Sequence, residues 1–396
     1  MRLSNSKKML KVFIFLSLVS LFADITYEVG RSVFGSYAKV LGATALLASL
    51  ATASELLSYI SRFISGLIAS KLKSSKVYWG LTFIGYIINL FAVPLLAFSG
   101  NWYIAIILIF LERIGKGLRA PARDVILAEV TEKMGRGKAF GLHEALDQIG
   151  AVAGPLIVSL SLLTTNSNYS IAFLVLAIPA ILALTFLSLA YFEYPKVKAA
   201  EGKFKNKTYA NNKNMKIFWI YSIAMSLVAL GFISWINFSY ILKDSRKMPD
   251  YSIAMLYSIA MLIDGLLAFP IGLMYDRSGL ISLLFAPVAS ALIILLLFTT
   301  QDYLSISIAA ALWGIVMAIY ETNARATIAD ILPEDKRAFG YGVFGLVFGV
   351  AWMLGSLIYA FIYENYPSLI VYFALFVESL AFALLVALIK MHKKKR

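Results

Sequence analysis

The sequence has no cysteine and only two histidines, His143 and His392. The absence of cysteine excludes disulfides, thiolate metal sites and cysteine nucleophiles. Two histidines are too few for a histidine-rich metal site. Residues 135–138, Gly-Arg-Gly-Lys, lack both the glycine spacing and the following Ser/Thr of a phosphate-binding loop. We therefore expect no metal, no cofactor and no ATP hydrolysis, and we do not expect an enzyme.

Charge is also scarce. Asp, Glu, Lys and Arg make up 15% of the chain, whereas about 25% is usual in soluble domains. Hydrophobic residues reach 60%, in runs long enough for bilayer spans, which need about 20 residues each. The sequence thus predicts an all-α integral membrane protein with twelve transmembrane helices. We place them at residues 11–41, 43–70, 77–98, 102–130, 139–163, 169–192, 216–242, 251–274, 280–299, 303–332, 337–363 and 367–390.

The basic residues give a net charge of +14 but fall in the gaps between apolar runs and at both ends of the chain. No gap contains a nucleic-acid-binding motif, so this pattern indicates membrane topology and no nucleic-acid partner. The basic N-terminus resembles a signal peptide, but no small-residue cleavage site follows it, which favours a retained first span. The positive-inside rule places both termini in the cytoplasm of a multi-pass cell-membrane protein.

A polar stretch at residues 193–215 is rich in lysine and asparagine, a composition typical of a flexible linker. We expect this cytoplasmic linker to separate an N-terminal six-helix bundle at 1–192 from a C-terminal six-helix bundle at 216–390. A basic cytoplasmic tail follows at 391–396.

The two halves repeat weakly. Residues 122–129 read Ala-Arg-Asp-Val-Ile-Leu-Ala-Glu, and residues 324–330 read Ala-Arg-Ala-Thr-Ile-Ala-Asp. Each is followed by Ala-Phe-Gly, at 139–141 and 338–340. Parallel six-span repeats with a binding site where they meet are a recurring transporter plan.

Short motifs carry a family resemblance. Residues 272–279, Gly-Leu-Met-Tyr-Asp-Arg-Ser-Gly, resemble the signature loop of the major facilitator superfamily. In the matching loop at 66–72, Ser70 stands where the family usually has Asp. Residues 113–117 are similar to the family's arginine–glycine motif, and residues 150–155 to a glycine–proline motif of its antiporter branches. The resemblance, closest to a poorly characterised prokaryotic subgroup, implies two six-helix bundles that enclose a central site and rock between two open states.

Charged side chains inside the apolar segments are the candidate functional residues, because a charge near the bilayer centre costs roughly 3 kcal/mol. Asp24, Glu28 and Arg31 are spaced i, i+4 and i+7, so they share one helix face. Two carboxylates one turn apart repel each other, which favours binding of a proton. Asp24, Glu28 and Asp147 are our proton-coupling candidates. In the alternative interpretation, Arg31 neutralises Glu28 and the trio braces an outer gate.

The remaining charges of the first half have mixed interpretations. Arg113 is expected near mid-membrane, where it would bind an anionic group of the substrate. Glu55 and Arg62 stand one heptad apart and are expected to pair. Other charges are expected to act in gating, Arg31 on the outer side and the rest near the cytoplasm. The gating candidates are Arg31, Arg119, Arg123, His143, Glu144, Asp276 and Arg277.

The second half is poorer in charge, which suggests that coupling belongs to the first half and that substrate contacts are shared. Aromatic residues offer walls for a cavity there. Besides Arg113, the substrate-binding candidates are Asn237, Asp264, Glu321, Asn323 and Arg325.

These observations favour a monomeric secondary transporter that exports a small organic compound in exchange for protons. One alternative is an importer, symporter or uniporter, of an anionic metabolite on the same fold. Another is a membrane sensor or lipid-moving protein that transports no solute.

Overall fold

The structure is a computed structural model that describes residues 2–72, 74–131, 136–197, 213–245, 248–300, 302–332 and 334–393. Within these residues the chain is almost entirely helical and contains no strand, which confirms the predicted all-α fold. Most of the predicted linker, at 198–212, and the last residues of the predicted tail, at 394–396, lie outside the described residues.

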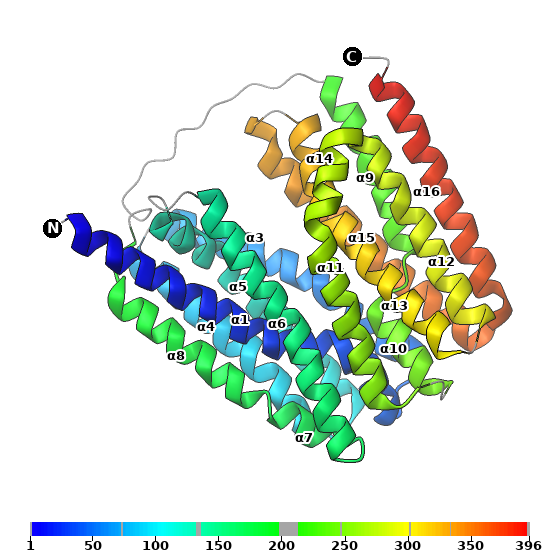
Figure 1. Cartoon of the computed structure of the whole chain (residues 1–396), viewed down its shortest axis with the longest axis horizontal. Helices are drawn as coiled ribbons and strands as arrows, with labels where there is room; N and C mark the ends of the chain where they lie inside the picture. Colours follow the sequence, from blue (N-terminus) through cyan, green and yellow to red (C-terminus); the bar gives the residue numbers. More distant parts are fainter. Residues whose placement is uncertain are drawn as a thin grey trace. The chain divides into compact units, whose positions relative to one another are not determined.

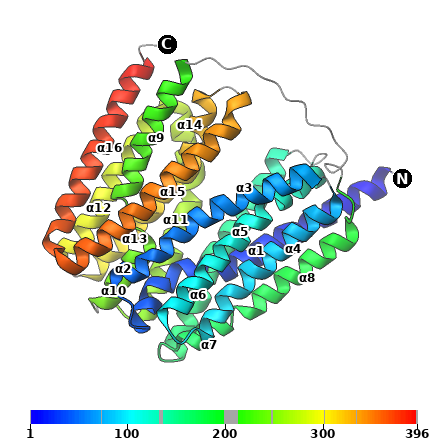
Figure 2. The same ribbon diagram turned by 180° about the vertical axis from the view of Figure 1, so that it is seen from behind.

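Helices occur at each of the twelve predicted segments (Figures 1 and 2). The first six segments form α1 (Arg2–Val40), α2 (Ala45–Ser49), η1 (Leu50–Ala53), α3 (Ser54–Leu72), α4 (Ser75–Leu95), η2 (Leu96–Phe98), α5 (Trp102–Val130), α6 (Arg136–Thr164), α7 (Tyr169–Leu174) and α8 (Ala177–Glu193). The last six form α9 (Lys213–Gly231), α10 (Trp235–Asp244), α11 (Asp250–Ser278), η4 (Gly279–Leu284), α12 (Phe285–Thr299), α13 (Tyr303–Ala318), η5 (Ile319–Asn323), α14 (Ala324–Ile331), α15 (Glu334–Asn365), η6 (Pro367–Leu369) and α16 (Ile370–Lys393).

The described residues include nine stretches that are long and apolar enough to cross a membrane, and one of them, Asp250–Thr299, covers both α11 and α12. The predicted spans at 43–70 and 102–130 are not among the nine. Charged residues on α3 and α5 lower the hydropathy of these two spans. Both helices contribute to the candidate site described below.

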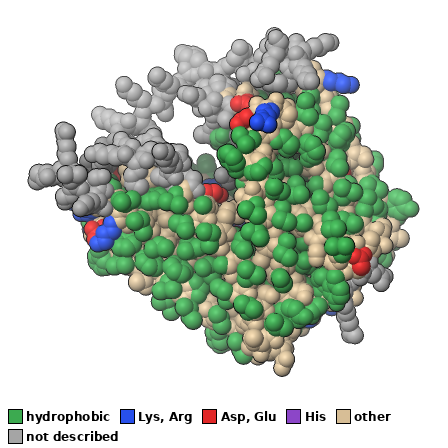
Figure 3. All heavy atoms as spheres, viewed as in Figure 1, with side chains coloured by type: hydrophobic (Ala, Val, Ile, Leu, Met, Phe, Trp, Pro, Cys, Tyr) green, Lys and Arg blue, Asp and Glu red, His purple; other side chains and the backbone are tan. Residues whose placement is uncertain are grey.

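Large apolar side chains cover much of the surface (Figure 3). Phe192 and Phe269 are 75% and 74% exposed, and many leucines and isoleucines are similarly open. Soluble monomers rarely expose apolar patches of this extent. Lipid chains would cover such a surface at no free-energy penalty, so the exposed side chains agree with a multi-pass membrane protein.

The chain divides into two compact units, residues 1–42 with 54–205, and residues 43–53 with 206–396. The short segment 43–53 therefore clusters with the second unit, although it precedes α3 in the chain. Two hydrogen bonds hold it there. Tyr240 donates its hydroxyl to the Ala43 carbonyl (2.8 Å), and Glu364 accepts from the Leu46 amide (2.8 Å).

The two units share one pattern of helix pairing. In the first unit, α1 packs on α6 and α8, while α5 packs on α3 and α4. In the second unit, α9 packs on α15 and α16, while α13 packs on α11 and α12. Counted as spans, the pairs 1–5, 1–6, 2–4 and 3–4 recur as 7–11, 7–12, 8–10 and 9–10. The weak sequence repeat thus corresponds to a repeat of the fold.

Span seven is broken, although the sequence suggested one continuous segment at 216–242. The α-helix stops at Gly231 and resumes at Trp235, with Ser234 as the N-cap of α10. Other helices bind the polar groups freed by this break. Trp313 donates its Nε1–H to the Ile233 carbonyl (3.0 Å), and Tyr359 donates its hydroxyl to the Gly231 carbonyl. Such partners allow irregular backbone within a membrane protein.

Span ten is irregular as well. Its α-helix changes to a π-helical turn, η5, before it continues as α14. Turns of this kind inside helices are frequent at functional sites. The turn carries Tyr320, Glu321 and Asn323, so the aromatic and polar residues expected near a cavity lie on distorted backbone.

We predict that Trp313→Phe destabilises the protein by about 1–3 kcal/mol, because the Ile233 carbonyl loses its donor in a buried place. The melting temperature of the purified protein measures this effect. Trp219→Phe is the matched control, because Trp219 is 42% exposed. Equal melting temperatures for the two variants would contradict the role of Trp313 at the break.

Candidate functional site

Polar side chains line one face of α1 within the first unit. Ser17, Ser20, Asp24, Glu28 and Arg31 follow one another at intervals of three or four residues, so they lie on one side of the helix. All of them except Arg31 are buried. The face meets α3, α5 and α6, and the site is built from these contacts.

Near the C-terminal end of α1, acidic and basic side chains alternate in space. Glu55 of α3 accepts from Arg31 of α1 (2.8 Å) and pairs with Arg113 of α5 (3.1 Å). Arg31 also lies 3.6 Å from Glu28, and Lys116 of α5 lies 3.7 Å from the other oxygen of Glu28. Three helices are thus connected by one chain of opposite charges. Glu55 pairs with Arg31 and Arg113, not with the Arg62 that its sequence spacing suggested.

Glu112 extends this chain of charges toward α4. Its Oε1 accepts from Asn89 Nδ2 of α4 (2.7 Å) and lies 3.2 Å from Arg113 Nη1. Glu112 and Arg113 are both almost fully buried. Arg113 therefore stands between two carboxylates, Glu55 and Glu112, rather than open to a ligand.

Aromatic rings surround the next two cations of α5. The Lys116 ammonium lies 4.1 Å from the centroid of Tyr27. The Arg119 guanidinium lies 4.2 Å from the centroid of Tyr86 and 5.5 Å from that of Tyr27. Arg119 also donates to the Tyr86 hydroxyl (3.0 Å). The faces of aromatic rings stabilise a desolvated cation. Arg119 is thus stabilised by two aromatic rings, whereas Arg113 is stabilised by two carboxylates.

His143 of α6 lies against the N-terminal half of α1. Its two ring nitrogens are 3.3 Å and 3.1 Å from the hydroxyls of Ser17 and Ser20. Arg123 of α5 donates to the same Ser20 hydroxyl (3.2 Å) and pairs with its neighbour Asp124 (2.7 Å). Two hydroxyls thus contact the imidazole, and Arg123 contacts one of these hydroxyls. Hydrogen bonds therefore link α6 to α1 and, through Ser20, to α5.

Asp147 lies one turn beyond His143 on α6, with 3.9 Å between its Oδ2 and His143 Nε2. Its other oxygen is buried and has no hydrogen-bond partner among the residues that the structure describes. Asp24 on α1 interacts electrostatically with Asp147 and with Lys116. The two carboxyls are therefore within electrostatic range of each other across the α1–α6 contact.

A glycine makes this closeness possible. A Cβ placed on Gly150 of α6 would lie 2.5 Å from the Leu21 carbonyl and 2.8 Å from Asp24 Cβ. Neither distance is sterically allowed, so only glycine lets α6 lie this close to α1. The glycine–proline motif of the sequence is therefore also what brings Asp147 close to Asp24.

The structure brings many of the first-half candidates together. Asp24, Glu28, Arg31 and Arg113 belong to one cluster of charges, and Arg119, Arg123, His143 and Asp147 extend it along α1 and α6. Glu144, next to His143, is exposed on α6. Sequence reasoning gave no role in the site to five of its members. Their common signal is a charged, polar or aromatic residue within an apolar span. These are Tyr27, Tyr86, Asn89, Glu112 and Lys116.

In the second half, the two asparagine candidates have separate partners. Asn237 donates to the Ser356 carbonyl (2.7 Å) and Asn323 to the Ser282 hydroxyl (3.0 Å). Asp264 is buried on α11, and Glu321 is partly buried on η5. The side chain of Arg325 lies outside the described part of the chain.

Asp276 and Arg277 are exposed at the C-terminal end of α11. They belong to the second unit, whereas His143 and Glu144 belong to the first. The expected gate between these two pairs therefore stays a prediction.

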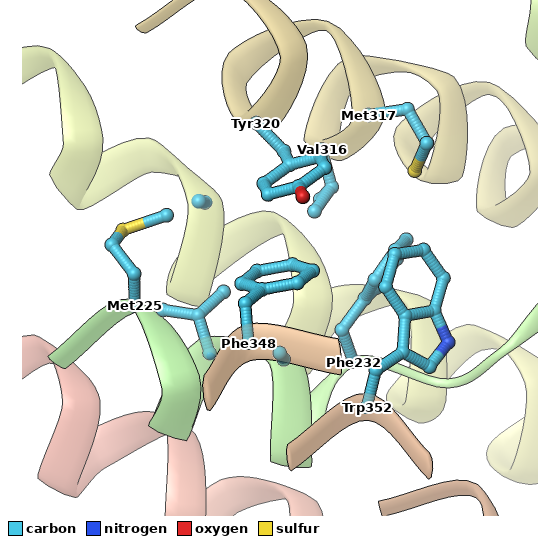
Figure 4. Close-up of a pocket in the computed structure, with 10 residues that line it drawn as sticks. Met225, Phe232, Val316, Met317, Tyr320, Phe348 and Trp352 are labelled. Atoms are coloured by element: carbon cyan, nitrogen blue, oxygen red, sulfur yellow. The ribbon is translucent and has the colours of Figure 1, made fainter. Parts of the chain in front are cut away.

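An apolar pocket lies inside the second unit between α9, α12, α13, η5 and α15 (Figure 4). Tyr320 stacks on Phe348 with 4.0 Å between ring centroids, and Trp352 meets Phe348 edge-on at 5.6 Å. Met225 and Phe232 of the span-seven region complete the wall. Of the aromatic residues expected near a cavity, Tyr320 is the one that lines this pocket.

Comparison with known proteins agrees with this architecture. The family model described as "Major Facilitator Superfamily" matches residues 14–277 and 232–396. An uncharacterized protein of Mycobacterium tuberculosis is 31% identical over 376 residues, which cover 94% of this chain and 91% of the relative. An uncharacterized MFS-type transporter of Methanocaldococcus jannaschii is 27% identical over 332 residues, with 80% and 79% of the two chains covered.

Solved structures share the fold at low sequence identity. The nucleoside transporter NupG superposes with a TM-score of 0.73 at 17% identity, over 96% of this chain and 99% of that one. A peptide transporter POT in complex with sulfate gives a TM-score of 0.78 at 15% identity, over 97% and 94%. At these identities the likeness establishes the fold and not the substrate.

We predict that Glu112→Gln destabilises the protein by about 2 kcal/mol, because Arg113 loses one of two charged partners in a buried place. Gln keeps an acceptor for Asn89, so the change isolates the charge. Thermal melting of the purified protein measures it.

Glu193→Gln is the control, because Glu193 pairs with Lys11 at an exposed position. Its melting temperature is expected to stay at the wild-type value, since solvent screens exposed pairs. If both variants melted like the wild type, the charges around Arg113 would not stabilise the fold.

Proposed function

Because the chain belongs to the major facilitator superfamily, we propose that it is a secondary active transporter that exports a small organic compound in exchange for protons. The proposal places the protein in the cell membrane as a monomer with both termini in the cytoplasm. Alternating access would come from movement of the two units against each other.

One observation carries the coupling part of the proposal. Asp24 and Asp147 interact electrostatically across the α1–α6 contact, and one oxygen of Asp147 has no hydrogen-bond partner within the described chain. Two buried carboxyls that interact electrostatically cannot both stay charged without a free-energy penalty. A proton relieves that penalty, so the pair is suited to take up and release one proton in each cycle. Glu28, one turn from Asp24, shares Lys116 with it.

The partners of Arg113 and Lys116 argue against a role for either residue in binding an anionic metabolite. A site for an anionic metabolite needs a cation that is not already neutralised. Arg113 pairs with Glu55 and Glu112, and Lys116 lies close to Glu28. Direction rests on the resemblance of residues 150–155 to the glycine–proline motif of antiporters.

The second unit would supply the substrate contacts. Its pocket combines stacked rings with the polar residues of η5 immediately beside it. We propose that Asn237, Asp264, Glu321, Asn323 and Arg325 bind polar groups of the substrate. Arg113, the remaining substrate-binding candidate, is not part of this proposal, because Glu55 and Glu112 already neutralise it. The cytoplasmic side of the site would be closed by His143, Glu144, Asp276 and Arg277. During that closure the first unit would be braced by Arg31, Arg119 and Arg123.

We predict that Asp24→Asn and Asp147→Asn each abolish proton movement driven by substrate but leave substrate exchange intact. Asn imitates the protonated acid and cannot release a proton. A melting-temperature screen against metabolites and drugs, repeated across pH, first identifies a ligand. Proteoliposomes that contain a pH-sensitive dye then report proton flux, and labelled ligand reports exchange.

Glu193→Gln serves as the control, because its carboxylate is exposed and far along the chain from the α1–α6 pair. Wild-type proton flux in both Asn variants would refute the assigned coupling residues. Complete absence of solute flux in the wild type, with lipid movement instead, would refute transport of a solute.

A further inference from the structure

Another buried carboxyl, that of Glu378, belongs to the second unit. It sits on α16 and is only 2% exposed. Neither of its oxygens has a hydrogen-bond partner among the described residues, and the same holds for Ser290 Oγ of α12, which interacts with the carboxyl. Buried polar atoms without partners usually mark a missing ligand, water or proton.

Among the described residues, no cation interacts with the Glu378 carboxyl. α9 presents Gly231, and a Cβ placed there would lie 2.6 Å from Glu378 Oε1. α12 presents Ser290, and α15 presents a titratable neighbour, Tyr359. Tyr359 donates its hydroxyl to the Gly231 carbonyl and not to the carboxyl. An isolated carboxylate in such a place would carry a desolvation penalty of several kcal/mol.

We propose that Glu378 and Ser290 form a proton-binding site inside the second unit, at the break between α9 and α10. A neutral carboxyl donates its O–H to Ser290 Oγ and packs its other oxygen against Gly231. The surroundings favour a proton over a metal cation, because a hard cation needs about six oxygen ligands. Here the carbonyl of the neighbouring Gly231 already accepts a hydrogen bond from Tyr359.

Protonation at this position would hold α16 against the end of α9. A Glu378 carboxylate would draw water to the Gly231 contact and separate the two helices. The site therefore makes the break in span seven sensitive to protons, independently of whether the first unit couples protons to transport.

Infrared spectroscopy of the purified full-length protein in phosphatidylcholine nanodiscs tests the proposal. At neutral pH, the wild type is expected to show a C=O band of a protonated carboxylic acid that shifts in D2O and is lost in Glu378→Gln. Glu364→Gln is the matched control, because Glu364 is an exposed carboxylate of the same unit. Its spectrum in this region is expected to match that of the wild type.

The melting temperature provides a second measurement. Glu378→Gln is a neutral isostere of the protonated acid, so it is expected to melt like the wild type. Identical carboxylic-acid bands in the wild type and Glu378→Gln would overturn the proposal. So would a sodium titration that stabilises the wild type but not Glu378→Gln, because the occupant would then be a metal ion.

Discussion

The packing of the first unit depends on buried ion pairs in which acidic and basic side chains neutralise each other. Glu55 and Glu112 bracket Arg113, and Lys116 lies against both Glu28 and the ring of Tyr27. Each ion carries a desolvation penalty that its partners offset only when geometry is good. The helices that hold these residues must therefore keep their register, and the small residues at their contacts allow it.

The two units use the same helix pairing but bury very different polar content. The first unit holds a connected set of ions and rings on α1, α3, α5 and α6. The second holds stacked aromatics, amides bound to a carbonyl or a hydroxyl, and a carboxyl, Glu378, that has no counter-ion among the described residues. One fold thus supports two chemical environments. Their difference agrees with the proposed function, in which the first unit exchanges protons and the second unit contacts the substrate.

Much of the fold was predictable, because apolar runs of about 20 residues admit little besides helices in a membrane. The breaks within the helices could not be predicted from the sequence. Phe232 and Ile233 look like continuous helix in sequence, and the donors that permit the break, Trp313 and Tyr359, come from distant spans. In the site, spacing along α1 correctly placed Asp24, Glu28 and Arg31 on one face. Spacing along one helix does not show which residues of other helices lie nearby. For this reason Glu55 was matched with Arg62, and Glu112 was given no role.

The grouping of residues 43–53 with the second unit has a consequence for how the protein is assembled. The boundary between the compact units runs through the chain before α3 as well as through the central polar stretch. A polypeptide cut within residues 198–212 would leave the second fragment without a segment that Tyr240 and Glu364 normally bind. The second unit therefore includes a piece of chain that is synthesised well before the rest of that unit.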